Sequence, residues 1–281
     1  MNPVVAVIAP GQMGSAVGNR LSENGITVLT NLEGRSSDSA QRAQATGMKS
    51  VSLQEIVTAD IILSIVPPGE AEPLATRLAP VLSSARNKPI YVDCNAVNPA
   101  TVERIAAIIK TTDCPFVDAG IIGGPPKAGY DGPGIYASGP DAGRFASLAD
   151  FGLVVHVMNG PIGAASAMKM SYAGITKGFT ALGCMMMLAA ARGGVAEGLR
   201  AELERSQPAL LPWLQRQIPA MYPKAYRFVG EMEEISDYVG EDVSAQEMFD
   251  AFADFYTRLA ADYEGKQDEV GALAPFLKPK Q

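Results

Sequence analysis

A glycine-containing segment near the amino terminus has the residue types and spacing of a dinucleotide site. It runs Ala9-Pro10-Gly11-Gln12-Met13-Gly14, between a short apolar run and a helix-like segment. A residue without a side chain at Gly11 lets the backbone approach a pyrophosphate, and Gly14 lets helix and strand pack closely. The helix N-terminus then offers N–H groups and a partial positive charge. We expect Gly11, Gln12, Met13 and Gly14 to bind a dinucleotide; a plain glycine-rich turn is the alternative.

The end of the second apolar run bears on which dinucleotide is bound. NAD-binding proteins place Asp or Glu there for the ribose hydroxyls, whereas this chain has Asn31. Asn removes the charge repulsion with a 2′-phosphate, and Arg35 and Ser36 can bind that phosphate directly. Glu33 is contrary evidence, because it can serve the ribose itself. The pattern favours NADP over NAD, and the alternative for Arg35 is a solvated loop charge.

Composition excludes several other kinds of site. The 281 residues include three widely spaced cysteines and one histidine, His156. The odd number of cysteines indicates reduced thiols rather than a disulfide framework or a zinc site, and we expect no metal. One histidine rules out most His-based metal sites and Ser-His-Asp triads, and His156 lies in an apolar run that suggests a structural role. A net charge of −7 disfavours binding to nucleic-acid phosphates.

Alternating elements position the glycine segment. Short apolar runs predict buried strands, with helix-like segments between them. The predicted strands are Val4–Ala9, Ile26–Thr30, Ile61–Val66, Ile90–Asp93, Phe116–Asp118, Gly134–Ser138 and Leu153–Met158. Ser52 to Glu55 has capping-box spacing, and Pro99 suits the first turn of a helix that ends near Lys110. The pattern predicts an α/β fold with a doubly wound, Rossmann-type parallel sheet.

The pattern changes after Gly160, where long helical segments replace the strands. Residues 162–191 predict one long helix rich in Ala and Met, and Ser244 to Glu247 predicts a capping box for a later helix. We therefore expect a dinucleotide-binding domain over residues 1–160. An all-helical domain that binds substrate and forms dimers follows over 161–281. The longest apolar stretch is shorter than the ~20 residues that a membrane-spanning helix needs, which predicts a soluble, cytoplasmic protein.

Four further motifs follow the glycine segment in a characteristic order. They are Val66-Pro67 after a strand, Asp93-Cys94-Asn95-Ala96-Val97-Asn98-Pro99, Asp118-Ala119-Gly120-Ile121-Ile122-Gly123-Gly124, and Gly160-Pro161-Ile162-Gly163 followed by Lys169. With these motifs the chain resembles the β-hydroxyacid dehydrogenase superfamily, which includes 3-hydroxyisobutyrate and 6-phosphogluconate dehydrogenases. The helical half resembles a divergent phosphogluconate-dehydrogenase-like branch. The resemblance implies that Val66, Pro67 and Asn95 also contact the cofactor.

The resemblance gives Lys169 the place of the family's catalytic lysine. A lysine in a partly dry cleft can donate a proton to a developing alkoxide or accept one from a hydroxyl, because burial lowers its pKa. The family pattern Lys-Met-x-His-Asn-Gly-Ile-Glu departs here to Lys169-Met170-Ser171-Tyr172-Ala173-Gly174-Ile175-Thr176. A Thr cannot act as the acid that decarboxylation of 6-phosphogluconate needs, so that substrate is disfavoured.

The substrate contacts implied by the resemblance are the glycine pair Gly123 and Gly124, with Ile122 in place of the family's Ser. Tyr172 and Thr176 lie on the same helix face as Lys169 and can replace the lost polar groups; packing roles for both are the alternative. Ile122 suggests a smaller or more apolar pocket.

These residues predict an oxidoreductase that interconverts a small 3-hydroxy acid, or a related hydroxy compound, with its carbonyl form. Lys169 is the expected proton donor and acceptor. The resemblance also implies a homodimer formed through the helical domain. We expect a small-molecule substrate as a partner, and neither nucleic acid nor a membrane. An imine reductase is one alternative, disfavoured because Lys169 is retained. A catalytically silent NADP(H)-binding sensor is the other, since the family's Asn and Ser are missing.

Overall fold

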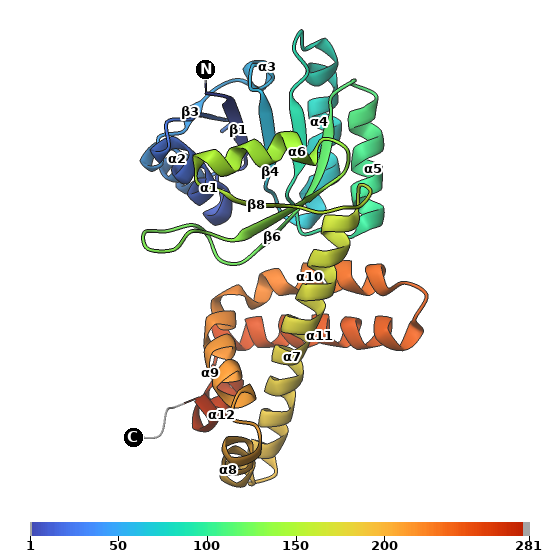
Figure 1. Cartoon of the computed structure of the whole chain (residues 1–281). Helices are drawn as coiled ribbons and strands as arrows, with labels where there is room; N and C mark the ends of the chain where they lie inside the picture. Colours follow the sequence, from blue (N-terminus) through green and yellow to red (C-terminus); the bar gives the residue numbers. More distant parts are fainter. Residues whose placement is uncertain (1, 278–281) are drawn as a thin grey trace. The chain divides into compact units, whose positions relative to one another are not determined.

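Strands and helices alternate through the first part of the chain in the computed structural model, which describes residues 2–277 (Figure 1). The strands are β1 (Val4–Ile8), β2 (Thr27–Thr30), β3 (Lys49–Ser50), β4 (Ile61–Ser64), β5 (Ile90–Asp93), β6 (Phe116–Ile122), β7 (Gly134–Ser138) and β8 (Val154–Val157). The helices between them are α1 (Gln12–Glu23), α2 (Ser37–Ala45), α3 (Leu53–Ile56), α4 (Ala71–Ser84), α5 (Pro99–Lys110) and α6 (Ala142–Phe145), with 3₁₀ turns η1 (Pro68–Glu70) and η2 (Ala146–Phe151).

The strands form one sheet in the order β3-β2-β1-β4-β5-β6-β7-β8. Neighbouring strands are parallel, except that β6 and β7 are antiparallel. The order reverses direction between β1 and β4, and such a switch point is where open α/β sheets bind nucleotides, outside the carboxyl ends of the strands. The predicted α/β class and doubly wound sheet are confirmed. The two-residue β3 escaped prediction, because both of its residues are exposed and it has no apolar run.

Helices cover both faces of the sheet, so the central strands are almost entirely buried. On one face, Val5, Val7 and Val117 pack with side chains of α1, α6 and η2. On the other, Ala6, Ile62 and Tyr91 pack with α4 and α5. Two predictions made from short sequence motifs are also confirmed. Ser52 and Glu55 form the predicted capping box, and Pro99 opens α5 behind the N-cap Asn98.

The chain divides into two compact units, Met1–Met170 and Ser171–Gln281. The long helix α7 (Ala164–Arg192) begins in the first unit and continues into the second, which contains only helices among its described residues. By length and composition alone α7 could cross a membrane. Half of its most apolar stretch is nevertheless buried, and core helices of soluble proteins can be as long and as apolar.

Glycines on α7 allow aromatic side chains to pack closely within the second unit. A Cβ on Gly174 would stand 3.2 Å from the Phe249 ring, and one on Gly178 would stand 3.3 Å from Phe252. Both rings belong to α11 (Val243–Glu264), which packs along α10 (Ala225–Val239) (Figure 1). The remaining helices are α8 (Ala196–Ser206), α9 (Leu210–Met221), the 3₁₀ turn η3 (Tyr222–Lys224) and α12 (Asp268–Leu277).

The capping box predicted at Ser244 is wrong. Helix α11 begins at Val243, so Ser244 lies inside its first turn. Asp242 is the N-cap instead, and its side chain accepts a hydrogen bond of 3.1 Å from the backbone N–H of Ala245. A carboxylate at the N-cap also has a favourable interaction with the helix dipole, which explains the earlier start.

Candidate cofactor and active site

The glycine segment has the geometry that a pyrophosphate requires. A Cβ on Gly14 would overlap the carbonyl oxygen of Ala9, so only glycine permits this approach of α1 to the end of β1. Gly11 has open space in place of a side chain and is the N-cap of α1. No side chain of the described residues caps that helix. Its first N–H groups therefore suit an anionic ligand, and the residues fit the phosphates of a dinucleotide.

The residues predicted at the ribose end have local structural partners. The Asn31 side chain donates a hydrogen bond of 2.9 Å to the carbonyl of Val51. Ser36 is the N-cap of α2, where its hydroxyl accepts from the N–H of Ser39. Arg35, in the same loop, is half-buried. These positions are compatible with ribose or phosphate binding, and the roles of Asn31, Arg35 and Ser36 stay predictions.

Arg42 is a residue that sequence reasoning missed. Its Nε donates to the carbonyl of Pro10 at 3.0 Å, and its terminal nitrogen donates to the Ser39 hydroxyl at 3.1 Å. The guanidinium thus connects the glycine segment to the first turn of α2, the helix that follows the ribose loop. Only its helical spacing from Ser39 could have signalled this, because the contact with Pro10 joins residues far apart in sequence.

Asn95 and Val66 belong to one buried network beside the glycine segment. The Asn95 Oδ1 accepts a hydrogen bond of 2.7 Å from the backbone N–H of Val66, and its Nδ2 donates to the Ser64 hydroxyl at 2.9 Å. Pro67 follows at the beginning of η1. Asn95 therefore fixes the loop after β4 relative to the loop after β5. Cofactor contacts of Val66, Pro67 and Asn95 stay predictions.

A buried carboxylate on β6 holds the start of α7. Asp118 Oδ2 accepts from the N–H groups of Gly163 and Ser166 and from the Ser138 hydroxyl, at 2.9, 3.1 and 3.0 Å. Its Oδ1 accepts from the Ser166 hydroxyl at 2.6 Å. Ser138 in turn accepts from the N–H of Ala165 at 3.0 Å. An ionised acceptor at a helix N-terminus satisfies its donors and its dipole together.

This anchor determines where Lys169 stands. Lys169 follows Ser166 by one helical turn and is half-buried. A Cβ on Gly120, two residues beyond Asp118 on β6, would stand 3.0 Å from the Lys169 Cβ. Gly120 thus lets α7 approach the strand closely. Since β1, β4, β5 and β6 are parallel, Lys169 and the glycine segment both lie at the carboxyl ends of these strands.

An aromatic pair lies beside the same stretch of β6. Gly120 is opposite Tyr136 on β7, and Tyr136 is opposite His156 on β8. The Tyr136 and His156 rings stack with centroids 4.9 Å apart. His156 is exposed, because β8 is the edge strand of the sheet. Residues opposite each other share a face, so both rings lie on the face that carries Lys169.

Polar residues continue across this face in one row. Ser64, Asp93, Asp118 and Ser138 are opposite one another on β4, β5, β6 and β7, and all are buried. Burial raises the pKa of Asp93 to about 7, and Asp118 adds to the rise, whereas the N–H of Asn95 and the charge of Lys169 act against it. Burial likewise raises the pKa of the Cys94 thiol, which leaves it neutral and unreactive.

The predicted substrate residues lie in two places. Ile122 ends β6, and Gly123 follows with a φ of +131°, where a side chain would meet Tyr130 and Pro133. Gly124 is exposed, with open space beside its Cα. Tyr172 and Thr176 are in the second unit, where Tyr172 is exposed and the Thr176 hydroxyl donates to the Tyr172 carbonyl. Their substrate contacts stay predictions.

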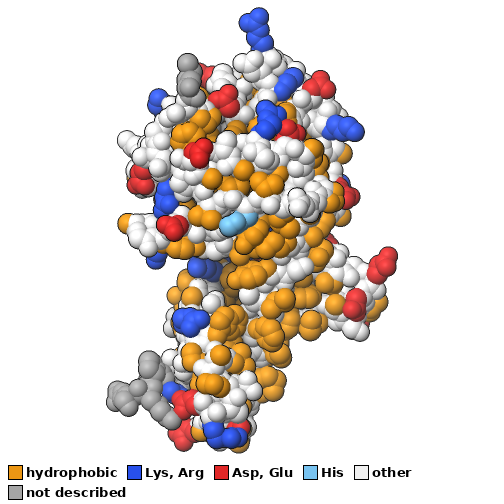
Figure 2. Space-filling view, in the orientation of Figure 1, with side chains coloured by type: hydrophobic (Ala, Val, Ile, Leu, Met, Phe, Trp, Pro, Cys, Tyr) orange, Lys and Arg blue, Asp and Glu red, His pale blue; other side chains and the backbone are white. Residues whose placement is uncertain are grey.

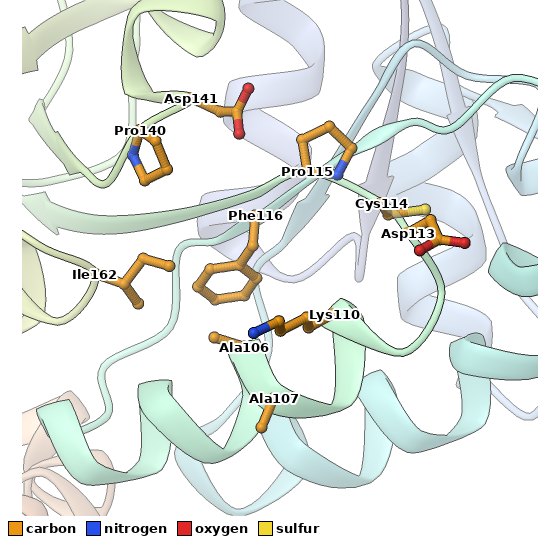
Figure 3. A pocket seen from close by; sticks show the side chains of 10 residues that line it. All are labelled: Ala106, Ala107, Lys110, Asp113, Cys114, Pro115, Phe116, Pro140, Asp141 and Ile162. Carbon is orange, nitrogen blue, oxygen red and sulfur yellow. The ribbon is translucent and has the colours of Figure 1, made fainter.

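A cavity of about 460 Å³ lies elsewhere in the first unit (Figure 3). Figure 3 shows the Phe116 ring and the Ile162 side chain pointing toward it, with Ala106 and Lys110 on the helix below. Because Phe116 begins β6, this cavity is at the amino end of the strand, away from Gly120 and Ile122. Within residues 2–277, no group of three or more His, Cys, Asp or Glu side chains is placed to hold a metal.

Comparison with protein-family models matches both halves of the chain. Residues 4–150 match the NAD binding domain of 6-phosphogluconate dehydrogenase. Residues 190–259 match a domain of unknown function, DUF1932. An uncharacterized 28.5 kDa protein of Methanothermus fervidus, encoded in a 7S RNA 5′ region, is 27% identical over 205 residues, which cover 72% of this chain and 77% of that protein.

Solved structures show the same fold. A conserved protein of unknown function, described as structurally similar to 3-hydroxyacid dehydrogenases, is 30% identical with a TM-score of 0.71; the match covers 92% of this chain and 97% of the other. The 3-hydroxyisobutyrate dehydrogenase of Mycobacterium tuberculosis, solved with L-serine, is 18% identical with a TM-score of 0.73 and coverage of 94% and 95%. An imine reductase of Myxococcus stipitatus in complex with NAD⁺ is 19% identical with a TM-score of 0.60, over 99% and 100%.

The glycine segment, the sheet order and these matches agree on a nicotinamide-dinucleotide fold in the first unit. The chain therefore belongs to the family that carries the NAD-binding domain of 6-phosphogluconate dehydrogenase, and its structure is similar to those of 3-hydroxyacid dehydrogenases.

Proposed function

We propose that the protein is an NADP(H)-dependent oxidoreductase that interconverts a small 3-hydroxy acid, or a related hydroxy compound, with its carbonyl form. The observation that carries this proposal is the placement of Lys169. Asp118 and Gly120 fix the backbone of this half-buried lysine at the carboxyl end of the strands, where the glycine segment also lies. A hydride-transfer site needs one group that moves a proton at that edge, and lysine can do so in either direction.

This placement of Lys169 leaves hydride transfer to the cofactor and assigns proton transfer to the protein. The nicotinamide, when bound, supplies or accepts the hydride. In reduction, the Lys169 ammonium gives a proton to the oxygen that becomes negative as the carbonyl is reduced. In oxidation, the neutral amine removes the hydroxyl proton. The N–H groups at the start of α1 would neutralise the charge of the pyrophosphate. Ile122, Gly123 and Gly124 would contact the substrate.

NADP is favoured over NAD by the side chains around the ribose loop. Arg35 and Ser36 follow Asn31 in the loop after β2, and none of these three side chains repels a 2′-phosphate. Arg42 adds a second guanidinium, which contacts Pro10 in the glycine segment. Arginine side chains are the donors expected for a phosphate rather than for a bare hydroxyl.

An exposed apolar stripe on α7 supports a homodimer formed through the second unit. Tyr172, Ile175, Phe179, Leu182 and Met186 follow one another on α7 at alternating spacings of three and four residues, and each is 47–61% exposed. In Figure 2, hydrophobic side chains gather over the helical unit along the course that α7 follows in Figure 1. Apolar residues at this spacing form a stripe, or seam, through which two helices can pair. A second copy of the chain supplies an identical seam. We assign the stripe to a homodimer; a cytoplasmic location stays a prediction.

A screen with purified protein tests the activity. Hydroxy acids with NADP⁺ and the matching carbonyl compounds with NADPH are monitored by nicotinamide absorbance, beside Lys169→Met and Lys169→Arg variants. We expect turnover of a small hydroxy acid that falls by at least about 10²-fold in Lys169→Met. Full turnover in that variant would remove Lys169 from the chemistry. Reduction of cyclic imines without any activity on hydroxy acids would favour an imine reductase, and cofactor binding without turnover would favour a sensor.

A further inference from the structure

Two buried aspartates face each other on neighbouring strands of the first unit. Asp93 ends β5, and its partner in the strand register is Asp118 on β6. Asp93 is 1% exposed and Asp118 is 0% exposed. Neighbouring strands are ~4.8 Å apart and opposite residues share a face, so the two carboxyl groups are close in a medium of low dielectric. Two like charges in such a place strongly disfavour simultaneous ionisation.

The two aspartates differ in the number of hydrogen-bond donors around them. Asp118 accepts four hydrogen bonds, from Gly163, Ser138 and both donors of Ser166. Asp93 has fewer donors: its Oδ1 accepts a hydrogen bond of 2.9 Å from the N–H of Asn95, and the Asn95 side chain also favours its ionised form. Its Oδ2 is buried and has no hydrogen-bond partner among residues 2–277. Donors stabilise a carboxylate, whereas a buried oxygen without a donor does not, so the surroundings of Asp93 favour its protonated form.

Titratable groups face Asp93 from three elements. Tyr91 and Cys94 come from its own strand and the residue after it, Asp118 comes from β6, and Lys169 comes from α7. Burial raises the pKa values of Tyr91 and Cys94, so both stay neutral at physiological pH. Lys169 is thus the cation that acts on Asp93, and its charge favours the ionised carboxylate. The interaction is reciprocal, so an ionised Asp93 also favours the ammonium form of Lys169.

We propose that Asp93 holds a proton in the resting protein and adjusts the proton affinity of Lys169 during the reaction. The inference rests on the proposed function of Lys169 and adds a second residue that acts through it. While Asp93 is neutral, Lys169 has the weaker hold on its proton that a general base needs. When Lys169 takes a proton from the substrate hydroxyl, the new ammonium charge favours loss of the Asp93 proton to water. The site thus gains one positive and one negative charge together, and one proton leaves for each hydride transferred.

A titration of the aspartate carboxyl carbons tests the inference without any substrate. The protein is labelled with [¹³Cγ]aspartate, and its spectra are recorded between pH 4 and 9, with and without NADP⁺. We expect one buried carboxyl with a midpoint near pH 7, absent in Asp93→Asn. In Lys169→Met the same midpoint is expected at higher pH, because the cation that favours ionisation is gone. The inference fails if every aspartate titrates at about pH 4, or if Lys169→Met leaves the midpoint unchanged.

The pH profile of kcat/KM for oxidation is the second measurement. The Asn in Asp93→Asn cannot ionise, so no negative charge at this position favours the ammonium form of Lys169. The limb of the profile that reports deprotonation of Lys169 is therefore expected to move to lower pH by roughly one unit. Asp150→Asn, at an exposed position, is the matched control and is expected to leave the profile in place. A profile of Asp93→Asn that superimposes on the wild type would overturn the inference. If the screen finds no substrate but the Asp93 carboxyl titrates as expected, the proposed activity is wrong, whereas the inference that Asp93 holds a proton in the resting protein is supported.

Discussion

The Asp118 carboxylate accepts a hydrogen bond of 2.6 Å from the Ser166 hydroxyl and so connects β6 to the helix that carries Lys169 one turn later. The same carboxylate accepts from the N–H groups of Gly163 and Ser166, so the helix start is held at three points. A rigid anchor of this kind positions a proton-transfer group to within the tolerance that catalysis demands.

Replacement of Asp118 is therefore expected to lower both stability and activity. Asp118→Ala leaves buried donors on Gly163, Ser138 and Ser166 without their acceptor, at a cost of about 3 kcal/mol in the free energy of unfolding. Urea unfolding followed by circular dichroism measures this loss. Ser138→Ala removes one of the four donors and serves as the milder comparison, with a cost of about 1 kcal/mol. Equal effects of the two substitutions would contradict the anchor role.

The two glycines of the dinucleotide segment are expected to respond differently to alanine. At Gly14 the new Cβ overlaps the Ala9 carbonyl, so Gly14→Ala should lower the melting temperature by several degrees. At Gly11 there is room for a Cβ in the protein itself, so Gly11→Ala should fold normally. A methyl group there obstructs the approach of the pyrophosphate, and NADPH affinity should fall by about tenfold or more. Differential scanning fluorimetry and calorimetric titration separate the two effects; a normal affinity in Gly11→Ala would contradict the proposed phosphate position.

Cofactor preference is expected to depend on Arg35 more selectively than on Arg42. Arg35→Ala removes a charge available only to the 2′-phosphate, so NADPH affinity should fall about tenfold while NADH affinity changes little. Arg42→Ala also removes the bond to Pro10, so binding of both cofactors should weaken. Arg86→Ala, at an exposed position, is the control. Equal losses for NADPH and NADH in Arg35→Ala would reject the 2′-phosphate assignment.

Features encoded by neighbouring residues could be predicted from the sequence. The glycine segment, the Ser52–Glu55 capping box and the Pro99 helix start each depend on a few consecutive residues and on one element. The anchor at Asp118 depends on residues more than forty positions away, and its partnership with Asp93 depends on strand register. A single sequence does not contain that register. The signal available was a charged residue within an apolar run, at Asp93 and again at Asp118, which indicates a buried polar role without naming the partner.

The exposed stripe on α7 is expected to hold two copies of the chain together. Phe179→Glu places a charge in the middle of the seam, where burial against a second copy would leave it unpaired. We expect the variant to sediment as a monomer in analytical ultracentrifugation, while the wild type sediments as a dimer. Val195→Glu changes a residue of similar exposure outside the stripe and should remain a dimer. A monomeric wild type, or dissociation caused by Val195→Glu, would rule out this seam.

Asp93 is expected to make the stability of the protein fall as the pH rises. Its pKa is raised from 3.8 to about 7 by burial, so between these values the folded protein keeps a proton that the unfolded chain releases. The unfolded state then binds fewer protons, and the free energy of unfolding decreases through this window and levels off above pH 7. The contribution is at most about 4 kcal/mol.

Asp93→Asn removes this titration while it keeps the size of the side chain and an acceptor for the N–H of Asn95. We expect the difference in stability between the variant and the wild type to change steadily in favour of the variant from pH 4 to pH 7, and then to stay constant. Urea unfolding at closely spaced pH values measures that difference. Carboxylates distant from Asp93 titrate equally in both proteins, so their contributions cancel. A difference that does not vary with pH would mean that Asp93 is ionised in the folded protein, and the charge at β5 would then have to be balanced by Lys169 directly.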